Sequence, residues 1–350
     1  MKKFFCVLLV MIMMFSMAAC GAAASAPEAR EPYEVRILSF TLGSFTYVMA
    51  MAWADLINQQ SDWLTATAWE SPSSIASELM MYDNPDMRTN TIYWGYADAA
   101  YRGTEQFTDK QHTRSQFITS FGVSLNAVVT CDPNVREPQD LAGRICGQFF
   151  GGASNPFTMA VFDFVQPPIR WEDMDASQRT ETVLSRRSAA TFLSAFAMSP
   201  ELDKWSGNPA SIELLARAGH VGFIQVPQDY AKQLRSEPGG PFEKFYMTVG
   251  TIPANSLDER QTEPLSVFIN NSPMLADQDM PDYVIEEMLR ILIDNLPSLA
   301  DLHPQAAMLT PEIMAVHPSL VTFHPAAKAY YESIGVTPMN LDDYLAARNQ

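Results

Sequence analysis

The sequence of 350 residues has little positive charge. It carries 23 lysine and arginine residues against 40 aspartate and glutamate residues, which gives a formal net charge of −17. A surface of this sign repels polyanions, so nucleic acid and an anionic membrane surface are excluded as main partners. Charged residues make up only 18% of the chain and hydrophobic residues 47%, which is enough for one large core or two medium ones.

Familiar catalytic and metal-binding patterns are also missing. No serine stands in a Gly-x-Ser-x-Gly elbow, and there is no Cys-x-x-Cys, His-Glu-x-x-His or Walker loop. His303, His317 and His324 each precede a proline, and their spacings match no structural zinc pattern. A His-Pro pair is more typical of a turn before a helix, with Pro325 at the first helical position. We therefore expect no enzymatic activity, no metal and no cofactor.

The N-terminus has the pattern of an exported protein. Two lysines precede an apolar run from Phe4 to Phe15, which fits a secretory leader and is too short for a comfortable membrane span. The run ends in Ala18-Ala19-Cys20, which resembles a bacterial lipobox, although ordinary cleavage near residues 22–24 is an alternative. We expect a signal peptide at 1–19, a lipid on Cys20 and a tether at 20–32. No later segment is apolar enough to span a bilayer, so lipid alone would hold the protein on the periplasmic side of a bacterial membrane.

Export changes the meaning of the remaining cysteines. With Cys6 in the leader and Cys20 committed to lipid, only Cys131 and Cys146 are left, each in an apolar run typical of a strand. A disulfide between them is one interpretation in an oxidising compartment. Two buried free thiols are the other, and the sequence leaves both open.

Strands alternate with helices along most of the chain, which indicates a mostly parallel α/β sheet covered on both faces. A unit of strand, polar loop and helix occurs three times, at Leu38–Tyr47, Glu70–Ile75 and Phe149–Phe157. Ligands in open α/β sheets bind outside the carboxyl ends of strands, and helix N-termini favour an anion there. Three such loops predict one shared cleft. Further along, Thr182–Met198 is predicted to be a helix.

Several motifs stand in a familiar order. They are the loop Thr41–Tyr47, the helix cap Ser71-Pro72-Ser73-Ser74, Asp140-Leu141-Ala142-Gly143, Gly151-Gly152-Ala153-Ser154, Gly207-Asn208-Pro209, and the stretch from Phe323 to Gly335 with its His-Pro and Tyr-Tyr pairs. In this order, from about Val35 to Val336, the chain resembles the solute receptors of the TAXI branch of TRAP transporters. No single motif is decisive, and it is their order and spacing together that carry the resemblance.

The resemblance implies a two-lobed α/β fold of the type II periplasmic-binding-protein kind, with a ligand cleft between the lobes. Residues 33–125 plus 241–350 would form the first lobe and 126–240 the second. The expected function is that of a monomeric extracytoplasmic receptor that delivers a small organic acid to a TRAP-type permease. A receptor of the same shape serving an ABC importer is the main alternative. An exported hydrolase is a weaker one, because no nucleophile has the required setting.

The loops after the predicted strands supply the expected ligand site. Thr46, Ser74 and Ser154 would hydrogen-bond a carboxylate near helix N-termini, while Tyr47, Trp94 and Phe150 would pack the rest of the solute. The full set of expected ligand-binding residues is Thr41, Gly43, Ser44, Thr46, Tyr47, Ser73, Ser74, Trp94, Tyr96, Phe150, Gly151, Gly152, Ser154 and Asn155. Bulky residues such as Phe40, Leu42 and Phe149 replace small ones in these loops, which favours a monocarboxylate with a hydrophobic or aromatic body over a short dicarboxylate.

Overall fold

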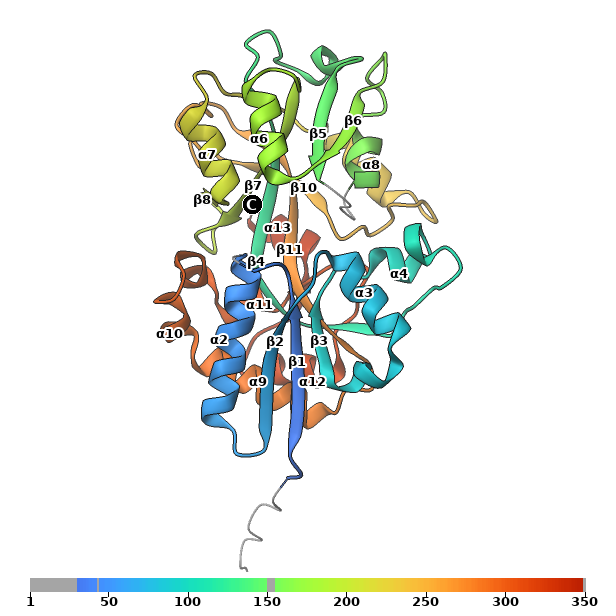
Figure 1. Cartoon of the computed structure of the whole chain (residues 1–350), viewed down its shortest axis with the longest axis vertical. Coiled ribbons are helices and arrows are strands. Elements are labelled where there is room, and N and C mark those ends of the chain that lie inside the picture. Colours follow the sequence, from blue (N-terminus) through green and yellow to red (C-terminus); the bar gives the residue numbers. More distant parts are fainter. Residues whose placement is uncertain (1–29, 43, 150–154, 349–350) are drawn as a thin grey trace, which may run out of the picture. The chain divides into compact units, whose positions relative to one another are not determined.

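A computed structural model of the chain describes residues 30–42, 44–149 and 155–348. The chain divides into the units Met1–Tyr33 and Glu34–Gln350. The second unit is built on one large curled sheet with helices around it (Figure 1). None of the helices in these ranges is long and apolar enough to cross a membrane.

The sheet has the strand order β2-β1-β3-β11-β4-β7-β5-β6, with β10 paired to β11, β8 to β7 and β9 to β4. Its strands are β1 (Tyr33–Ser39), β2 (Leu64–Glu70), β3 (Thr91–Trp94), β4 (Ser115–Thr130), β5 (Ile145–Phe149), β6 (Arg170–Met174), β7 (Ala190–Ala197), β8 (Trp205–Gly207), β9 (Gly222–Ile224), β10 (Thr248–Ile252) and β11 (Leu265–Asp277). A separate pair joins β12 (Val316–His317) to β13 (Met339–Asn340).

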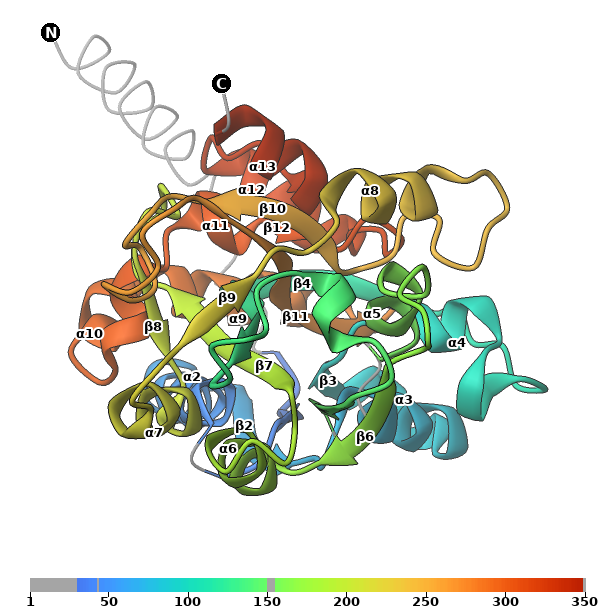
Figure 2. The same cartoon turned by 90° about the horizontal axis from the view of Figure 1, so that it is seen from above.

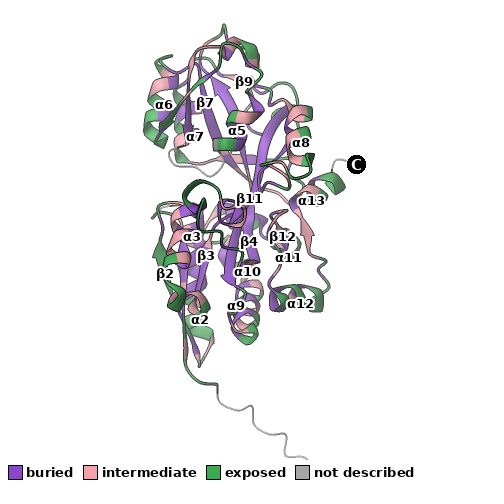
Figure 3. Ribbon diagram, turned by 90° about the vertical axis from the view of Figure 1, so that its right-hand side faces the viewer, coloured by how far each residue is buried: buried purple, intermediate pink, exposed green. Residues whose placement is uncertain are grey.

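Two long central strands connect two groups of shorter ones. We call β1, β2 and β3 the first strand group and β5, β6 and β7 the second. Figure 1 shows these groups at opposite ends of β4 and β11. Strand β11 is buried at every position and β4 at nearly all, so both strands are covered on both faces although each carries several polar residues. The burial view in Figure 3 shows the same pattern. The predicted two-lobed α/β architecture is confirmed, and the residue boundaries of the lobes stay a prediction.

Helices cover both groups. They are α2 (Phe45–Gln60), α3 (Ser74–Asp83), α4 (Asp98–Arg102), α5 (Asn155–Val161), α6 (Ala176–Leu184), α7 (Pro209–Arg217), α8 (Gln228–Ser236), α9 (Asp282–Asp294), α10 (Leu296–Ala300), α11 (Pro311–Met314), α12 (Pro325–Ser333) and α13 (Leu341–Arg348). Short 3-10 turns lie at Pro85–Asn90, Glu105–Phe107, Pro138–Leu141 and Pro304–Met308. Viewed along the long strands, α6 and α7 lie outside the curve of the second group (Figure 2).

The predicted helix over Thr182–Met198 is wrong. In the structure α6 ends at Leu184 and the following residues form β7, which pairs with both β4 and β5. The segment from Ala190 to Ala197 is rich in alanine, which favours a helix locally. It is also a short apolar run, and sheet pairing on both sides overrides so weak a local preference.

Cys131 and Cys146 are both free thiols in this structure, so the structure has the second of the two alternatives left open by the sequence. Strand β7 lies between their strands, because Val129 of β4 is opposite Thr191 and Cys146 of β5 is opposite Ala190. Two strand spacings amount to roughly 9–10 Å, and a disulfide needs Cα atoms within about 7 Å. Burial also raises the pKa of Cys146 to about 12, which makes its thiol inert.

Candidate functional site

The carboxyl ends of the two strand groups face each other along β4. Strands β1 and β3 are parallel, as are β5, β6 and β7, whereas β4 is antiparallel to β7 and β11, and β11 to β3. Strand β3 therefore ends beside Met274 of β11, which is opposite Thr119 of β4. Strand β7 ends with Phe196 opposite Ser124 of β4. Five residues of strand separate the two levels, or roughly 16 Å. The carboxyl ends of the two strand groups thus face one region.

The loops of the first group begin two helices with serine caps. The Ser44 hydroxyl accepts a hydrogen bond from the backbone nitrogen of Tyr47 at 3.2 Å and lies 3.3 Å from the hydroxyl of Thr46. The Ser73 hydroxyl caps α3 in the same way, accepting from Ala76 at 3.1 Å. These bonds satisfy amide groups that a helix start leaves open, which confirms the cap predicted at the start of α3.

The expected binding residues of these two loops differ in their exposure. Thr41 is exposed, Ser44 and Tyr47 are half-buried, and Thr46 is buried. In the second loop Ser73 is half-buried and Ser74 is buried. The exposed and half-buried loop residues are accessible to a solute, whereas Thr46 and Ser74 are largely covered by their surroundings.

Part of the expected site lies outside the described residues. Gly43, Phe150, Gly151, Gly152 and Ser154 fall there, and so does Cys20. Asn155 begins α5, directly after the loop that follows β5.

Aromatic rings form a continuous row at the end of β3. Phe40 lies 5.1 Å from Trp94, and Trp94 lies 5.5 Å from Tyr96, measured between ring centroids. Tyr96 stacks on Tyr246 at 3.7 Å, which joins the end of β3 to the segment before β10. The indole nitrogen of Trp94 is buried and has no hydrogen-bond partner among the described residues. An unsatisfied buried donor needs an explanation, and a ligand acceptor supplies one.

Polar side chains on β4, β7 and β11 lie close to the level at which β7 ends. The Asn270 amide donates to the Tyr96 hydroxyl at 2.6 Å, and the Ser124 hydroxyl donates to Asn270 at 3.1 Å. Two residues further along β4, Asn126 accepts a hydrogen bond from the Ser194 hydroxyl at 2.7 Å. Sequence reasoning missed these residues. The signal was the run Asn270-Asn271-Ser272 inside an otherwise apolar strand, because buried polar groups in strand centres are uncommon.

Two buried carboxyl groups lie behind the end of β3. Glu78 accepts hydrogen bonds from the backbone nitrogens of Tyr96 at 3.2 Å and Ala97 at 2.7 Å, while its second oxygen has no partner in the described part of the chain. Burial raises the pKa of Glu78 to about 8 despite these bonds. Burial likewise raises the pKa of Asp98 to about 7, although Arg102 lies 3.4 Å away. Both groups can therefore hold a proton near neutral pH.

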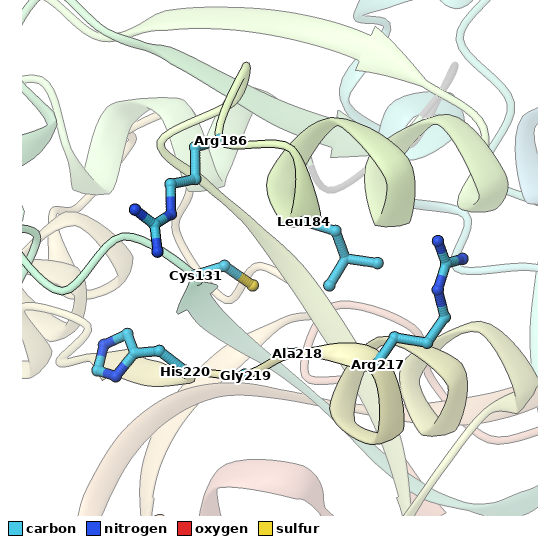
Figure 4. A pocket seen from close by; sticks show the side chains of 7 residues that line it. All are labelled: Cys131, Leu184, Arg186, Arg217, Ala218, Gly219 and His220. Carbon is cyan, nitrogen blue, oxygen red and sulfur yellow. The ribbon is translucent and has the colours of Figure 1, made fainter.

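Two cavities lined by described residues lie away from the predicted site. A cavity of about 340 Å³ is lined by Cys131, Leu184, Arg186, Arg217, Ala218, Gly219 and His220, with the Arg186 and His220 side chains on either side of Cys131 (Figure 4). A second, of about 370 Å³, lies between α8, β10 and α13. No expected ligand-binding residue lines either of them.

Two of the His-Pro histidines start helical turns. His324 accepts from the backbone nitrogen of Ala326 at 3.3 Å and α12 begins at Pro325, which confirms the predicted turn and helix start. His303 caps the turn Pro304–Met308 in the same manner. In the described residues no group of three or more histidine, cysteine or acidic side chains is arranged to hold a metal ion.

The fold is a two-lobed α/β fold in which the carboxyl ends of two strand groups face each other. In sequence, residues 38–335 match the NMT1-like family, and the chain belongs to that family. No curated protein matches it in sequence.

The chain is similar to several solved structures. An R. palustris protein solved with adipate is 13% identical, and the alignment covers 91% of this chain and 98% of that protein's chain, with a TM-score of 0.49. A structure described as a periplasmic transporter is 12% identical, with 93% and 96% coverage and a TM-score of 0.46. The periplasmic aliphatic sulphonate binding protein from Escherichia coli is 11% identical, with 91% and 85% coverage and a TM-score of 0.45.

Proposed function

We propose that this protein is an extracytoplasmic solute receptor that captures a small organic acid and delivers it to a TRAP-type permease. One observation supports the proposal most: the carboxyl ends of the two strand groups face each other along the shared strands β4 and β11. The loops of the first group carry serine-capped helix starts, and bending of the two long strands would bring the groups together.

The proposed mechanism is capture by closure. A solute that contacts both strand groups stabilises the closed state over the open one, and the permease recognises the closed state. Residues 33–125 plus 241–350 would move against residues 126–240, and the chain would bend where β4 passes from one lobe to the other. A lipid on Cys20 would keep the monomeric receptor close to the membrane.

The proposed solute has one carboxylate and a hydrophobic or aromatic body. The row formed by Phe40, Trp94 and Tyr96 offers flat apolar surface at the end of β3. The unpartnered indole nitrogen of Trp94 and the serine-capped starts of α2 and α3 offer donors and positive helix ends for an acceptor.

A binding screen tests the function. Thermal unfolding should shift upward with aromatic monocarboxylates such as benzoate or phenylacetate, because a saturating ligand adds several kcal/mol of apparent stability. Calorimetry should then show that Trp94→Ala loses roughly 2–4 kcal/mol of binding free energy, against about 1 kcal/mol for Ser74→Ala. Micromolar binding of a short dicarboxylate with no heat from aromatic acids would refute the proposed solute. Turnover of an ester panel would instead favour the hydrolase.

The transporter partner has its own test. A TRAP permease and an ABC importer use receptors of the same shape, so the transporter genes beside this gene distinguish them. Pull-down of the detergent-solubilised permease by the solute-loaded receptor, and not by the free receptor, should then identify the partner.

A further inference from the structure

Arg179 on α6 is an arginine in an unusual place. Its side chain is only 8% exposed, and it lies between α6 and the second strand group. Arginine is almost never buried to this extent unless an acidic group is paired with it.

No such partner exists in the described part of the chain. One guanidinium nitrogen donates to the backbone oxygen of Phe192 at 3.3 Å, and Nε is buried without any hydrogen bond. No carboxylate forms an ion pair with Arg179 within the described ranges. Burial lowers the pKa of Arg179 to about 10, and the more distant Asp175 only partly opposes this shift. Within the described residues the Arg179 guanidinium is therefore largely buried and has no carboxylate paired with it.

The side chain runs along β5 towards the carboxyl end of that strand. A methyl group on Gly147 would lie 3.2 Å from Cγ of Arg179, so glycine leaves room for the aliphatic stem. Further along the strand, the guanidinium carbon lies 4.1 Å from the centre of the Phe149 ring, and Phe149 is the last residue of β5. The Arg179 guanidinium group therefore lies at the carboxyl end of β5, at the edge of the second strand group that faces the first.

We propose that Arg179 binds the acidic group of the solute and so fixes which end of the solute enters the second lobe. This inference rests on the receptor function proposed above. A carboxylate would give the guanidinium the bidentate partner that its geometry suits and would remove the cost of its uncompensated burial.

The opposite side of the site has the opposite character. Behind the end of β3 lies Glu78, whose second carboxyl oxygen is unpartnered among the described residues, together with the aromatic row ending in Tyr96. An apolar end of the solute would meet aromatic rings there, whereas a second carboxylate would lose its water against those rings. A solute with a single acidic group is the class that this arrangement favours.

Matched probes test the role of Arg179. Benzoate and benzamide, and phenylacetate and its amide, have the same shapes and differ in charge; adipate and glutamate carry two carboxylates. We expect the wild-type protein to bind the better aromatic acid at least 30-fold more tightly than its amide by calorimetry at constant ionic strength. Arg179→Met should abolish this preference. The control Arg217→Met, which removes an exposed arginine paired with Glu181 and Glu213, should retain it.

A stability measurement separates a binding role from a structural one. Arg179→Met removes an uncompensated buried charge, so its urea midpoint without ligand should equal or exceed that of wild type. Arg179→Lys keeps the charge but lacks the planar fork, and it should lose about tenfold in affinity for the aromatic acid. It also serves as the test variant if the methionine variant does not fold.

Several outcomes would overturn the proposal. They are retention of the acid preference in Arg179→Met, wild-type affinity in Arg179→Lys, and tighter binding of adipate or glutamate than of the aromatic acids by the wild type. A wild-type protein that binds the amides as tightly as the acids would overturn the role of Arg179 and leave the receptor function standing. Binding of no member of the panel would overturn both.

Discussion

The buried carboxyl group of Glu78 should make the protein's stability depend on pH. Its pKa is about 8 in the folded state, because burial disfavours the charged form, against an ordinary value of 4.5. Between these values the folded state binds more protons than the unfolded state, so the free energy of unfolding falls as pH rises from 4.5 to 8. Glu78→Gln keeps an acceptor for the amides of Tyr96 and Ala97 but cannot ionise. We expect wild type to lose on the order of 3 kcal/mol relative to Glu78→Gln over this window.

Urea unfolding of both proteins at intervals from pH 5 to pH 8.5 measures the difference directly. The control is Glu332→Gln, an exposed carboxylate on α12, whose profile should run parallel to that of wild type. Parallel profiles for wild type and Glu78→Gln would mean that Glu78 is ionised in the folded protein throughout.

Single residues also show where sequence reasoning stops. The serine cap at Ser73 could be predicted because cap, loop and helix are neighbours in the chain. Arg179 could not, because its significance is the lack of a partner, and partners come from distant strands. The same holds for Asn270, which meets Tyr96 across 174 positions of sequence.

Among the elements, β4 depends on a bend at Gly122. Ser120 is opposite Pro273 and Val123 is opposite Asn271, so Phe121 and Gly122 share one position on β11, which is a β-bulge. Gly122 has φ of +98°, and a methyl group there would lie 3.2 Å from the sulfur of Met308. We expect Gly122→Ala to lower the free energy of unfolding by roughly 1–3 kcal/mol in urea denaturation.

Gly219→Ala is the matched control for this substitution. Gly219 has no heavy atom within 4 Å of the added methyl position, so the control should change stability little. Equal losses in the two variants would show that the bulge tolerates a side chain and that its glycine is not required for the bend.

Two helices with serine caps could be predicted from the sequence, whereas the capped start of α6 at Asp175 was missed. The segments Phe45–Gln60 and Ser74–Asp83 have serine caps and are helices as predicted. Strand β7 has no such local signal, since its alanine-rich sequence suits either state and pairing with β4 and β5 decides the outcome. The two strand groups face each other because of the way β4 and β11 pass through the sheet. No local sequence pattern encodes this path.

For the molecule as a whole, the prediction of a lipid anchor rests on Met17-Ala18-Ala19-Cys20. Cys20→Ser removes the thiol that would accept lipid. We expect the variant either to appear in the soluble fraction or to keep its leader uncleaved, which membrane fractionation with mass analysis distinguishes. A variant that is processed and fractionates like wild type would disprove the lipoprotein prediction.

The net charge of the whole molecule should affect the kinetics of solute binding. The chain has a formal charge of −17, so an anionic solute approaches against a repulsive field. The Debye length falls from about 30 Å at 0.01 M salt to about 8 Å at 0.15 M, so added salt removes this repulsion at long range. The proposed contact between Arg179 and the solute's acidic group acts at short range, so salt screens it much less. In stopped-flow measurements the association rate constant of an aromatic monocarboxylate should therefore rise about two- to fivefold over this range, with a nearly constant dissociation rate constant. Its uncharged amide is the control and should show no trend. An association rate that falls with salt would mean that the site's own positive field extends into solvent and outweighs the net charge.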